Sequence, residues 1–280
     1  MSRKTMIRKV SGDMEPFSRN KLMSSLRRSG ADNETVESVL TDVESWIYEG
    51  ITTKKIYDRA FAFLRKKQLG IAARYKLKNA MMELGPTGYP FEFFVGQVFK
   101  QLGFHVEVGK VLQGHCVTHE VDVIATKDMN QHFVECKYYQ STGKNANVQV
   151  PMYIRSRVDD LINFRKDLPE YKGYTFHGVV VTNTRFTSDA ISFGECTGLQ
   201  MLSWDYPAGN GLKEIIDEKH IFPVTVLTKL LNAEKQDLME RGIVICSQLL
   251  ENPEALVHIG LDERRQQKIM EEVRSLCPNC

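Results

Sequence analysis

Three residues near the middle of the chain, Asp122, Glu135 and Lys137, have types and spacing that suit hydrolysis of a phosphate ester. Glu135 and Lys137 are two residues apart in an apolar run that resembles a strand, so their side chains project from one face. Asp122 lies in another apolar run, and an antiparallel neighbouring strand can place its carboxylate beside them. Charged groups among apolar strands are costly to bury unless they are paired or bind a metal.

Oxygen ligands of this kind select a hard cation, Mg²⁺ or Mn²⁺, which keeps several waters and lowers the pKa of one of them. Lys137 would orient that water or assist its deprotonation, and would stabilise charge on the phosphate. The alternative is a buried ion pair that holds two strands in register. Spacing alone leaves the two interpretations evenly matched, because a glutamate and a lysine two apart are common on strands.

The elements around these residues alternate between helix and strand from Tyr89 to Tyr206, which favours a mixed sheet with helices on both faces. The pattern predicts helices over Phe91–Leu102, Met152–Arg165 and Thr187–Cys196. It predicts strands over Phe104–Val108, Glu120–Ala125, His132–Tyr138, Gly178–Thr182 and Gln200–Trp204. We therefore expect an α/β domain over residues 89–220.

This stretch resembles the Mrr-like branch of the PD-(D/E)xK restriction endonucleases over roughly 110 residues. The matching pieces are Phe91–Phe93, Leu102–Phe104, His119–Ala125, Val134–Lys137, Val179–Asn183, Phe186–Thr187 and Ala190. The resemblance implies a restriction-endonuclease-like fold and metal-dependent hydrolysis of double-stranded DNA, and a role in defence follows from it alone.

Carried over from this resemblance, Asp122 and Glu135 become metal ligands, the Cys136 carbonyl a third ligand, and Lys137 the catalytic lysine. Glu92 matches a helix glutamate that helps to organise the metal site. Many Mrr-like proteins have glutamine where this chain has Glu135. Gln149, which follows the strand, either reaches the site or simply caps a helix.

Residues 1–88 form a basic segment, with 17 lysines and arginines against 10 aspartates and glutamates. A strand pair is expected at Met6–Val10 and Glu15–Phe17, joined by a turn at Ser11–Asp13. Helices are expected at Lys21–Ser29, with Ser18 and Asn20 as candidate caps, and at Asn33–Tyr48, Thr53–Lys67 and Ile71–Leu84. Such a surface suits an anionic ligand, although a solvated basic face is also compatible with it.

Residues 7–21, 50–53 and 73–75 resemble the ATP-cone, a regulatory domain that binds ATP or dATP. The resemblance places Lys9, Glu15, Lys21, Thr53 and Tyr57 near the nucleotide, with Tyr57 where some members have histidine. Lysines on a hairpin and at a helix start suit phosphates. Because the segment has no glycine-rich phosphate loop, we expect binding of adenine nucleotide without turnover. The alternative is a basic helical module that binds nucleic acid.

Residues 221–280 are expected to form short helices broken at Gly242 and Gly260. The two glycines resemble the turns of helix-hairpin-helix units, whose backbone N–H groups contact DNA phosphates. With 7 basic against 9 acidic residues, the segment lacks the charge of a backbone binder, so a structural or oligomerisation role is favoured. Cys277 and Cys280 have metal-ligand spacing but no second pair, which favours a solvated tail over zinc.

The remaining composition suggests a cytoplasmic protein, and we also expect a homo-oligomer. Six irregularly spaced cysteines suit a reducing compartment, and no run is long and apolar enough for a membrane span. We expect a Mg²⁺- or Mn²⁺-dependent endodeoxyribonuclease controlled by ATP or dATP. The alternatives are a non-catalytic, nucleotide-responsive DNA-binding regulator and a nuclease that processes RNA.

Overall fold

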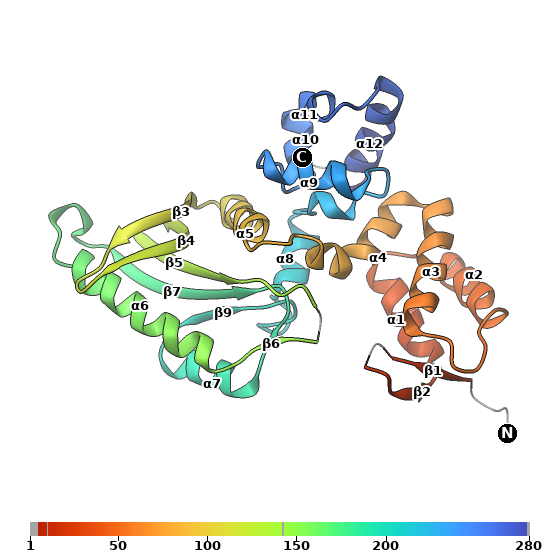
Figure 1. Cartoon of the computed structure of the whole chain (residues 1–280), viewed down its shortest axis with the longest axis horizontal. Coiled ribbons are helices and arrows are strands. Elements are labelled where there is room, and N and C mark those ends of the chain that lie inside the picture. The colour runs from red at the N-terminus through yellow and green to blue at the C-terminus, as the bar shows by residue number, and fades with distance from the viewer. Residues whose placement is uncertain (1–4, 10, 142, 279–280) are drawn as a thin grey trace.

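A computed structural model describes residues 5–9, 11–141 and 143–278. Figure 1 shows a helical N-terminal module on the right, an α/β domain on the left and a group of C-terminal helices above them. Within the described residues, no helix combines the length and the apolar character needed to cross a membrane.

The N-terminal module is a small antiparallel hairpin followed by four helices, as the sequence predicts. Its elements are β1 (Met6–Arg8), β2 (Met14–Pro16), α1 (Arg19–Arg28), α2 (Asn33–Glu44), α3 (Thr53–Lys67) and α4 (Leu69–Met82). Ser18 caps α1 by accepting a hydrogen bond from the Lys21 N–H. The expectation that Asn20 is a cap is wrong, because Asn20 lies inside α1. The second helix ends at Glu44 rather than Tyr48, and Val10 lies outside the described residues.

The α/β domain contains a five-stranded mixed sheet in the order β3-β4-β5-β7-β9. The first three strands are antiparallel, and β5, β7 and β9 are parallel. The strands are β3 (His105–Gln113), β4 (Thr118–Lys127), β5 (Asn130–Lys137), β7 (Thr175–Thr182) and β9 (Gln200–Leu202), with a separate short pair, β6 (Asn145–Ala146) and β8 (Arg185–Phe186). The helices are α5 (Tyr89–Gln101), α6 (Gln149–Arg165), α7 (Ser188–Cys196) and α8 (Leu212–Glu218), with a 3₁₀ turn, η1 (Pro169–Tyr171), after α6.

The two faces of the sheet belong to separate cores, and the alternation along β5 assigns each residue to one of them. Val134 and Cys136 pack with α5, whereas Phe133 packs with α6. The polar residues Glu135 and Lys137 therefore project on the α6 face, as their spacing predicts.

The C-terminal helices share a core with α4 and α5 and with one face of the sheet. They are η2 (Val224–Val226), a 3₁₀ turn, and α9 (Asn232–Glu240), α10 (Ser247–Glu251), α11 (Glu254–His258) and α12 (Glu263–Leu276). Gly242 and Gly260 adopt left-handed conformations in the turns after α9 and α11. Cys277 is buried, which corrects the expectation of a solvated tail, and Cys280 lies outside the described residues.

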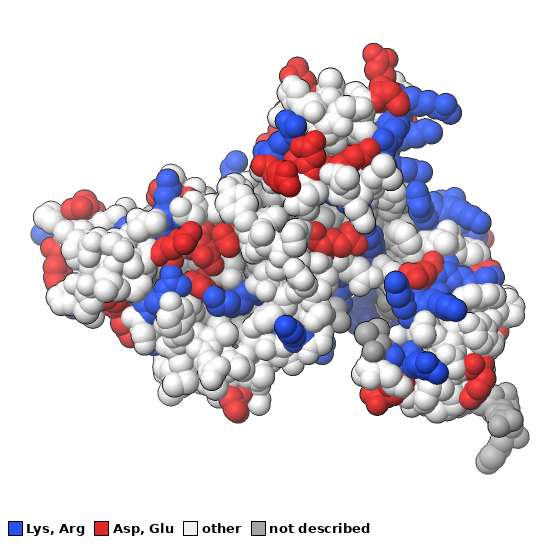
Figure 2. Space-filling view, viewed as in Figure 1, with Lys and Arg blue, Asp and Glu red and all other residues white. Residues whose placement is uncertain are grey.

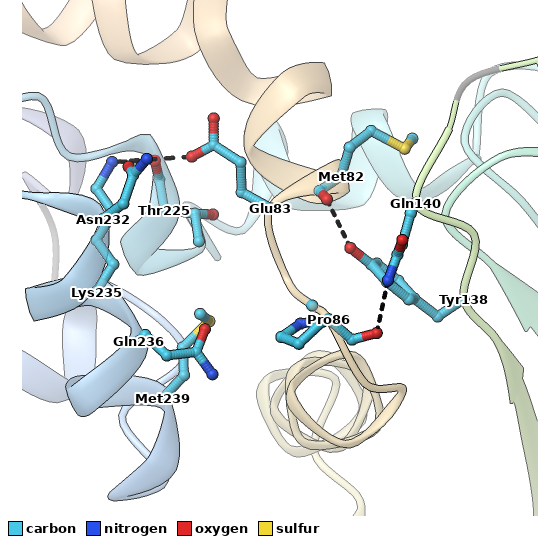
Figure 3. Close-up of a pocket in the computed structure, with 11 residues that line it drawn as sticks. Met82, Glu83, Pro86, Tyr138, Gln140, Thr225, Asn232, Lys235, Gln236 and Met239 are labelled. Atoms are coloured by element: carbon cyan, nitrogen blue, oxygen red, sulfur yellow. Dashed lines mark hydrogen bonds and ion pairs between the residues drawn. The ribbon is translucent and has the colours of Figure 1, made fainter.

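Hydrogen bonds connect the segment after β5 to the end of α4 and the residues that follow it (Figure 3). The Tyr138 hydroxyl donates to the carbonyl of Met82 at 2.6 Å, and the Gln140 amide donates to that of Pro86 at 2.8 Å. Asn183 bonds to both backbone groups of Tyr139, at 2.9 and 2.8 Å. The segment that follows β5 is therefore hydrogen-bonded both to the chain at the end of α4 and to Asn183.

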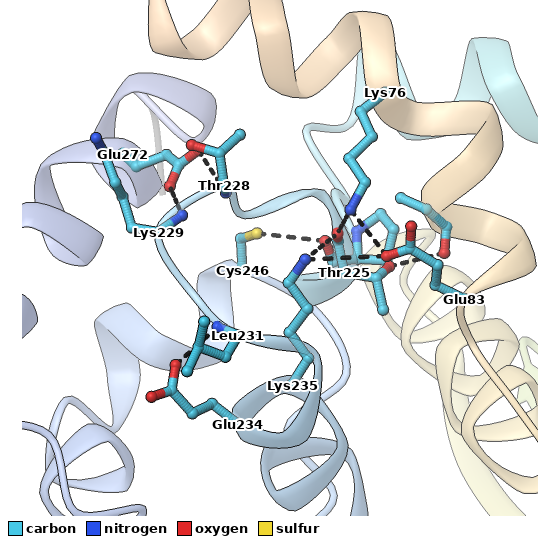
Figure 4. Close-up of polar contacts among 12 residues, drawn as sticks. Lys76, Glu83, Thr225, Thr228, Lys229, Leu231, Glu234, Lys235, Cys246 and Glu272 are labelled. Atoms are coloured by element: carbon cyan, nitrogen blue, oxygen red, sulfur yellow. Dashed lines mark hydrogen bonds and ion pairs between the residues drawn. The ribbon is translucent and has the colours of Figure 1, made fainter. Parts of the chain in front are cut away.

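Two lysines join α4 to the C-terminal helices (Figure 4). Lys76 bonds to Glu83 at 2.8 Å and to the carbonyl of Thr225 at 2.9 Å, and Lys235 donates to the same carbonyl at 3.0 Å. Lys235 is only 5% exposed. Burial, and then the proximity of Lys76, lowers the pKa of Lys235 to about 8.

Replacing Lys235 by methionine is expected to remove a pH-dependent contribution to the unfolding free energy. A lysine whose pKa is lower in the folded than in the unfolded chain binds fewer protons when folded. The unfolding free energy of the wild type should therefore rise, relative to Lys235→Met, by about 1 to 3 kcal/mol between pH 8 and pH 10.5. Urea denaturation of both proteins across this range measures the difference. Lys268→Met, at an exposed position of α12, is the control; an equal trend for both variants would contradict the prediction.

Candidate active site

Asp122, Glu135 and Lys137 meet where the pairing between strands is interrupted. The register of β4 and β5 ends with Val123 opposite Val134, so the next residues, Asp122 and Glu135, lie at the point where the strands separate. The carboxylate of Asp122 accepts a hydrogen bond from the Cys136 N–H at 2.7 Å. The side chain thus takes a backbone donor at the end of this ladder and is held in place by it.

On its other side, β4 is also irregular at Asp122. The β3–β4 register omits one pair, in which Gly109 would lie opposite Asp122. Gly109 has a positive φ of 63°, a conformation that glycine adopts without the steric cost of a side chain. The sheet therefore departs from regular pairing on both sides of this carboxylate.

Glu135 is held by two cations on the α6 face of the sheet. Lys137 donates to one carboxylate oxygen at 2.6 Å and Arg157 donates to the other at 2.6 Å. Arg157 also donates to the carbonyl of Glu120. These contacts hold the carboxylate in one orientation, although each oxygen can still accept a further ligand.

Arg157 is not among the site residues that the sequence predicts. The only local signal is its place on α6 among the apolar positions Ile154, Val158 and Leu161, all of which are buried. An arginine beside apolar positions can simply keep its head group in solvent at the edge of the buried face, or it can belong to a functional site. Its contact with Glu135 depends on how α6 crosses the sheet.

Arg157→Met is expected to destabilise the fold by about 1 to 3 kcal/mol, because it removes one partner of a buried carboxylate and of a carbonyl. Arg155→Met is the matched control on the same helix, since Arg155 pairs with the half-exposed Asp159. We expect that variant to lose about 1 kcal/mol or less. Chemical denaturation compares the two, and equal losses would contradict the assigned role.

Glu92 approaches the same group from the first turn of α5. Burial, followed by repulsion from Asp122, Glu120 and Glu135, raises the pKa of Glu92 to about 7. Burial and then Glu135 likewise raise the pKa of Asp122 to about 6. These four carboxylates are therefore close enough for repulsion among them to raise the pKa values of Glu92 and Asp122.

For the ammonium of Lys137, burial and the neighbouring carboxylates change the pKa in opposite directions. Burial alone would lower its pKa, but the hydrogen bond and the attraction to Glu135 outweigh burial and raise it. Lys137 also faces open space, since it lines a pocket of about 540 Å³ together with Pro86, Gly88 and Lys144. A bulky substrate can approach Lys137 from this side.

Within the described residues, no three side chains among histidine, cysteine, aspartate and glutamate form a ready metal site. The donors nevertheless fit a hard cation, because two carboxylates and a backbone carbonyl supply oxygen atoms and water supplies the rest. Burial, and then repulsion from neighbouring carboxylates, raises the pKa values of Asp122 and Glu92 and disfavours their ionised forms. A bound cation would relieve that repulsion.

Of the other expected site residues, Gln149 is exposed at the start of α6, and its hydrogen bonds are with Asn147. On the N-terminal module, Glu15 lies 2.8 Å from Lys9 and 3.2 Å from Lys21. Thr53 begins α3. Tyr57 instead stacks against Tyr75 of α4, with ring centroids 5.0 Å apart.

Comparison with known proteins agrees with this geometry. Residues 86–205 match the Mrr catalytic family model, described as restriction endonuclease. This part of the chain is therefore similar to a restriction-endonuclease domain. The matched residues include the whole candidate site, from Glu92 on α5 to Arg157 on α6.

This α/β domain is followed by a second matched segment, residues 222–277, described as AF1548-like, C-terminal. An uncharacterized protein of Archaeoglobus fulgidus is 25% identical over 183 residues, which cover 65% of this chain and 99% of that protein. The crystal structure of AF1548, a protein of unknown function, aligns with a TM-score of 0.56 at 24% identity. That alignment covers 69% of this chain and 100% of the other, and it shows a shared fold.

Proposed function

We propose that this protein is a Mg²⁺- or Mn²⁺-dependent endonuclease that hydrolyses phosphodiester bonds of double-stranded DNA. The observation that carries the proposal is the meeting of Asp122, Glu135 and Lys137 at the separated ends of β4 and β5. A structural ion pair needs only Glu135 and a cation. The additional carboxylates of Asp122 and Glu92, whose pKa values are raised, are unfavourable for stability and suit a cation site.

Asp122, Glu135 and the carbonyl of Cys136 would hold the metal ion, which supplies Lewis acidity and a water of lowered pKa when bound. Lys137 orients the attacking water and stabilises charge on the phosphate through its ammonium. Arg157 keeps Glu135 oriented, and Glu92, on the first turn of α5, would help to organise the metal site.

A plasmid assay tests this proposal. Wild-type protein should nick or linearise supercoiled DNA with Mg²⁺ or Mn²⁺ and not with EDTA, and Glu135→Gln should lose this activity. Lys172→Gln, at an exposed position far along the chain from the site, is the control. Parallel reactions with methylated DNA and with RNA identify the substrate. DNA binding without cleavage of any substrate would instead support the non-catalytic regulator, and cleavage by Glu135→Gln at the wild-type rate would overturn the site.

We further propose that ATP or dATP bound by the N-terminal module controls the nuclease. Lys9 and Lys21 converge on Glu15 at an exposed hairpin and helix start, where they can exchange that carboxylate for phosphates. Calorimetry should detect binding of either nucleotide, and Lys21→Gln should weaken it at least about 10-fold. Lys54→Gln is the charge-matched control. Absence of heat with both nucleotides would exclude this regulation.

Two wider roles rest on these proposals. A restriction or defence function would appear as reduced phage infection that depends on Lys137. A homo-oligomer, joined through the C-terminal helices, would appear in light scattering as a multiple of the chain mass.

A further inference from the structure

A basic cleft separates the N-terminal module from the nuclease domain. It has a volume of about 410 Å³, and α1, α4 and α8 and the segments around β8 and β9 line it. Five cationic side chains reach it: Arg28, Arg74, Lys78, Arg185 and Lys213. Figure 2 shows lysine and arginine atoms set back in the hollow between the two parts of the molecule.

Acidic neighbours pair with only three of these cations. Arg185 lies 2.8 Å from Asp205, Lys213 lies 3.1 Å from Glu214, and Arg74 lies 3.5 Å from Asp217. Among the described residues, no acidic side chain forms an ion pair with Arg28 or Lys78. The cleft therefore holds two more positive than negative charges.

Two local observations show that this positive charge is incompletely compensated. The Nε atom of Arg74 is buried and lies 3.5 Å from Asp217, but it donates no hydrogen bond to an acceptor among the described residues. The pKa of Lys78 is lowered, first by burial of part of its side chain and then by the neighbouring Arg185. An anion in the cleft would stabilise both groups.

The end of β7 connects the cleft with the proposed nuclease site. Thr182, the last residue of β7, is paired with Lys137, and its hydroxyl donates to the Lys137 carbonyl at 2.7 Å. Arg185 follows only three residues later, a path of about 10 Å in extended chain. Duplex DNA carries a negative charge for about every 1.7 Å of its axis, so one duplex can present phosphates to both places.

We propose that this cleft binds the phosphate backbone of the DNA whose cleavage we propose above, so that the N-terminal module forms part of the substrate-binding surface. Arg28 and Lys78 contribute from the module, and Arg185 contributes from the nuclease domain. Free nucleotide is the other source of phosphate. The open cleft between two parts of the molecule, with an unpaired cation from each of two helices, suits a long polyanion better.

The test measures binding separately from cleavage. A fluorescent 20-base-pair duplex is titrated with the full chain carrying Lys137→Ala, in EDTA, over a range of NaCl concentrations. Adding Arg28→Gln and Lys78→Gln should weaken binding at least about 10-fold and reduce the salt dependence by about two counterions. Lys54→Gln with Lys66→Gln changes the same charge on exposed positions of α3 and should have little effect.

An unchanged salt dependence in the cleft variant, or an equal loss in the control pair, would overturn the proposal. So would a cleft variant that loses binding of ATP but binds DNA as the parent protein does, since the cleft would then belong to free nucleotide. Because the assay needs no cleavage, it distinguishes the two proposals. A protein that cleaves DNA but binds it normally without Arg28 and Lys78 refutes only the cleft.

Discussion

Lys137→Ala is expected to lower the rate of DNA cleavage by at least about 100-fold without unfolding the protein. Lys137 supplies the ammonium beside Glu135, and its side chain is one-third exposed toward the adjoining pocket. Its removal leaves Glu135 bound to Arg157 and leaves Asp122 bound to the Cys136 N–H. The carboxylates should therefore keep their positions while the cation nearest the substrate is lost.

The measurement is the initial rate of plasmid nicking with saturating Mg²⁺, with circular dichroism to verify the fold. Lys172→Ala controls for the loss of one surface charge. Lys137→Arg separates the charge from the shape of the side chain, because arginine retains the charge but replaces the compact ammonium by a larger, planar group. Substantial activity in Lys137→Arg would assign Lys137 to charge stabilisation. Equal nicking by Lys137→Ala and the wild type would refute the active site.

Asp122→Asn is expected to abolish cleavage and, without metal, to leave the protein as stable as the wild type or more stable. Burial and Glu135 raise the pKa of Asp122 to about 6, above its usual value of 3.8. A carboxyl whose pKa is raised binds more protons when folded, so its ionisation lowers the unfolding free energy as pH rises from about 4 to about 6. Asparagine avoids this loss and still offers an oxygen to the Cys136 N–H.

Thermal unfolding in EDTA at pH 4.5 and pH 7.5 measures this effect. The advantage of Asp122→Asn should be on the order of 1 to 2 kcal/mol at pH 7.5 and smaller at pH 4.5. Mg²⁺ should stabilise the wild type at pH 7.5 and leave the variant unchanged, because the metal requires ionised carboxylates. Asp128→Asn, in the exposed β4–β5 turn, is the control. An equal response of Asp122→Asn to Mg²⁺ would exclude Asp122 as a ligand.

Much of the fold follows from local patterns in the sequence. The period of two along β5 correctly predicts that Glu135 and Lys137 share a face, and the helical spacing of apolar residues predicts α3 at its observed bounds. Ser18 was predicted as a cap because a short hydroxyl side chain satisfies a free N–H at a helix start. Asn20 is equally suitable by type, and only the position of the first turn decides between them.

The sequence by itself determined the strand and helix pattern and the residue types of the candidate active site, because these depend on neighbours a few positions apart. Only the tertiary structure decided which groups complete that site. Arg157 lies 22 residues from Glu135 and reaches it because α6 crosses that face of the sheet. The basic cleft brings together Arg28 and Arg185, which lie far apart in the sequence. Contacts over such separations depend on how packed elements meet, which no local periodicity specifies.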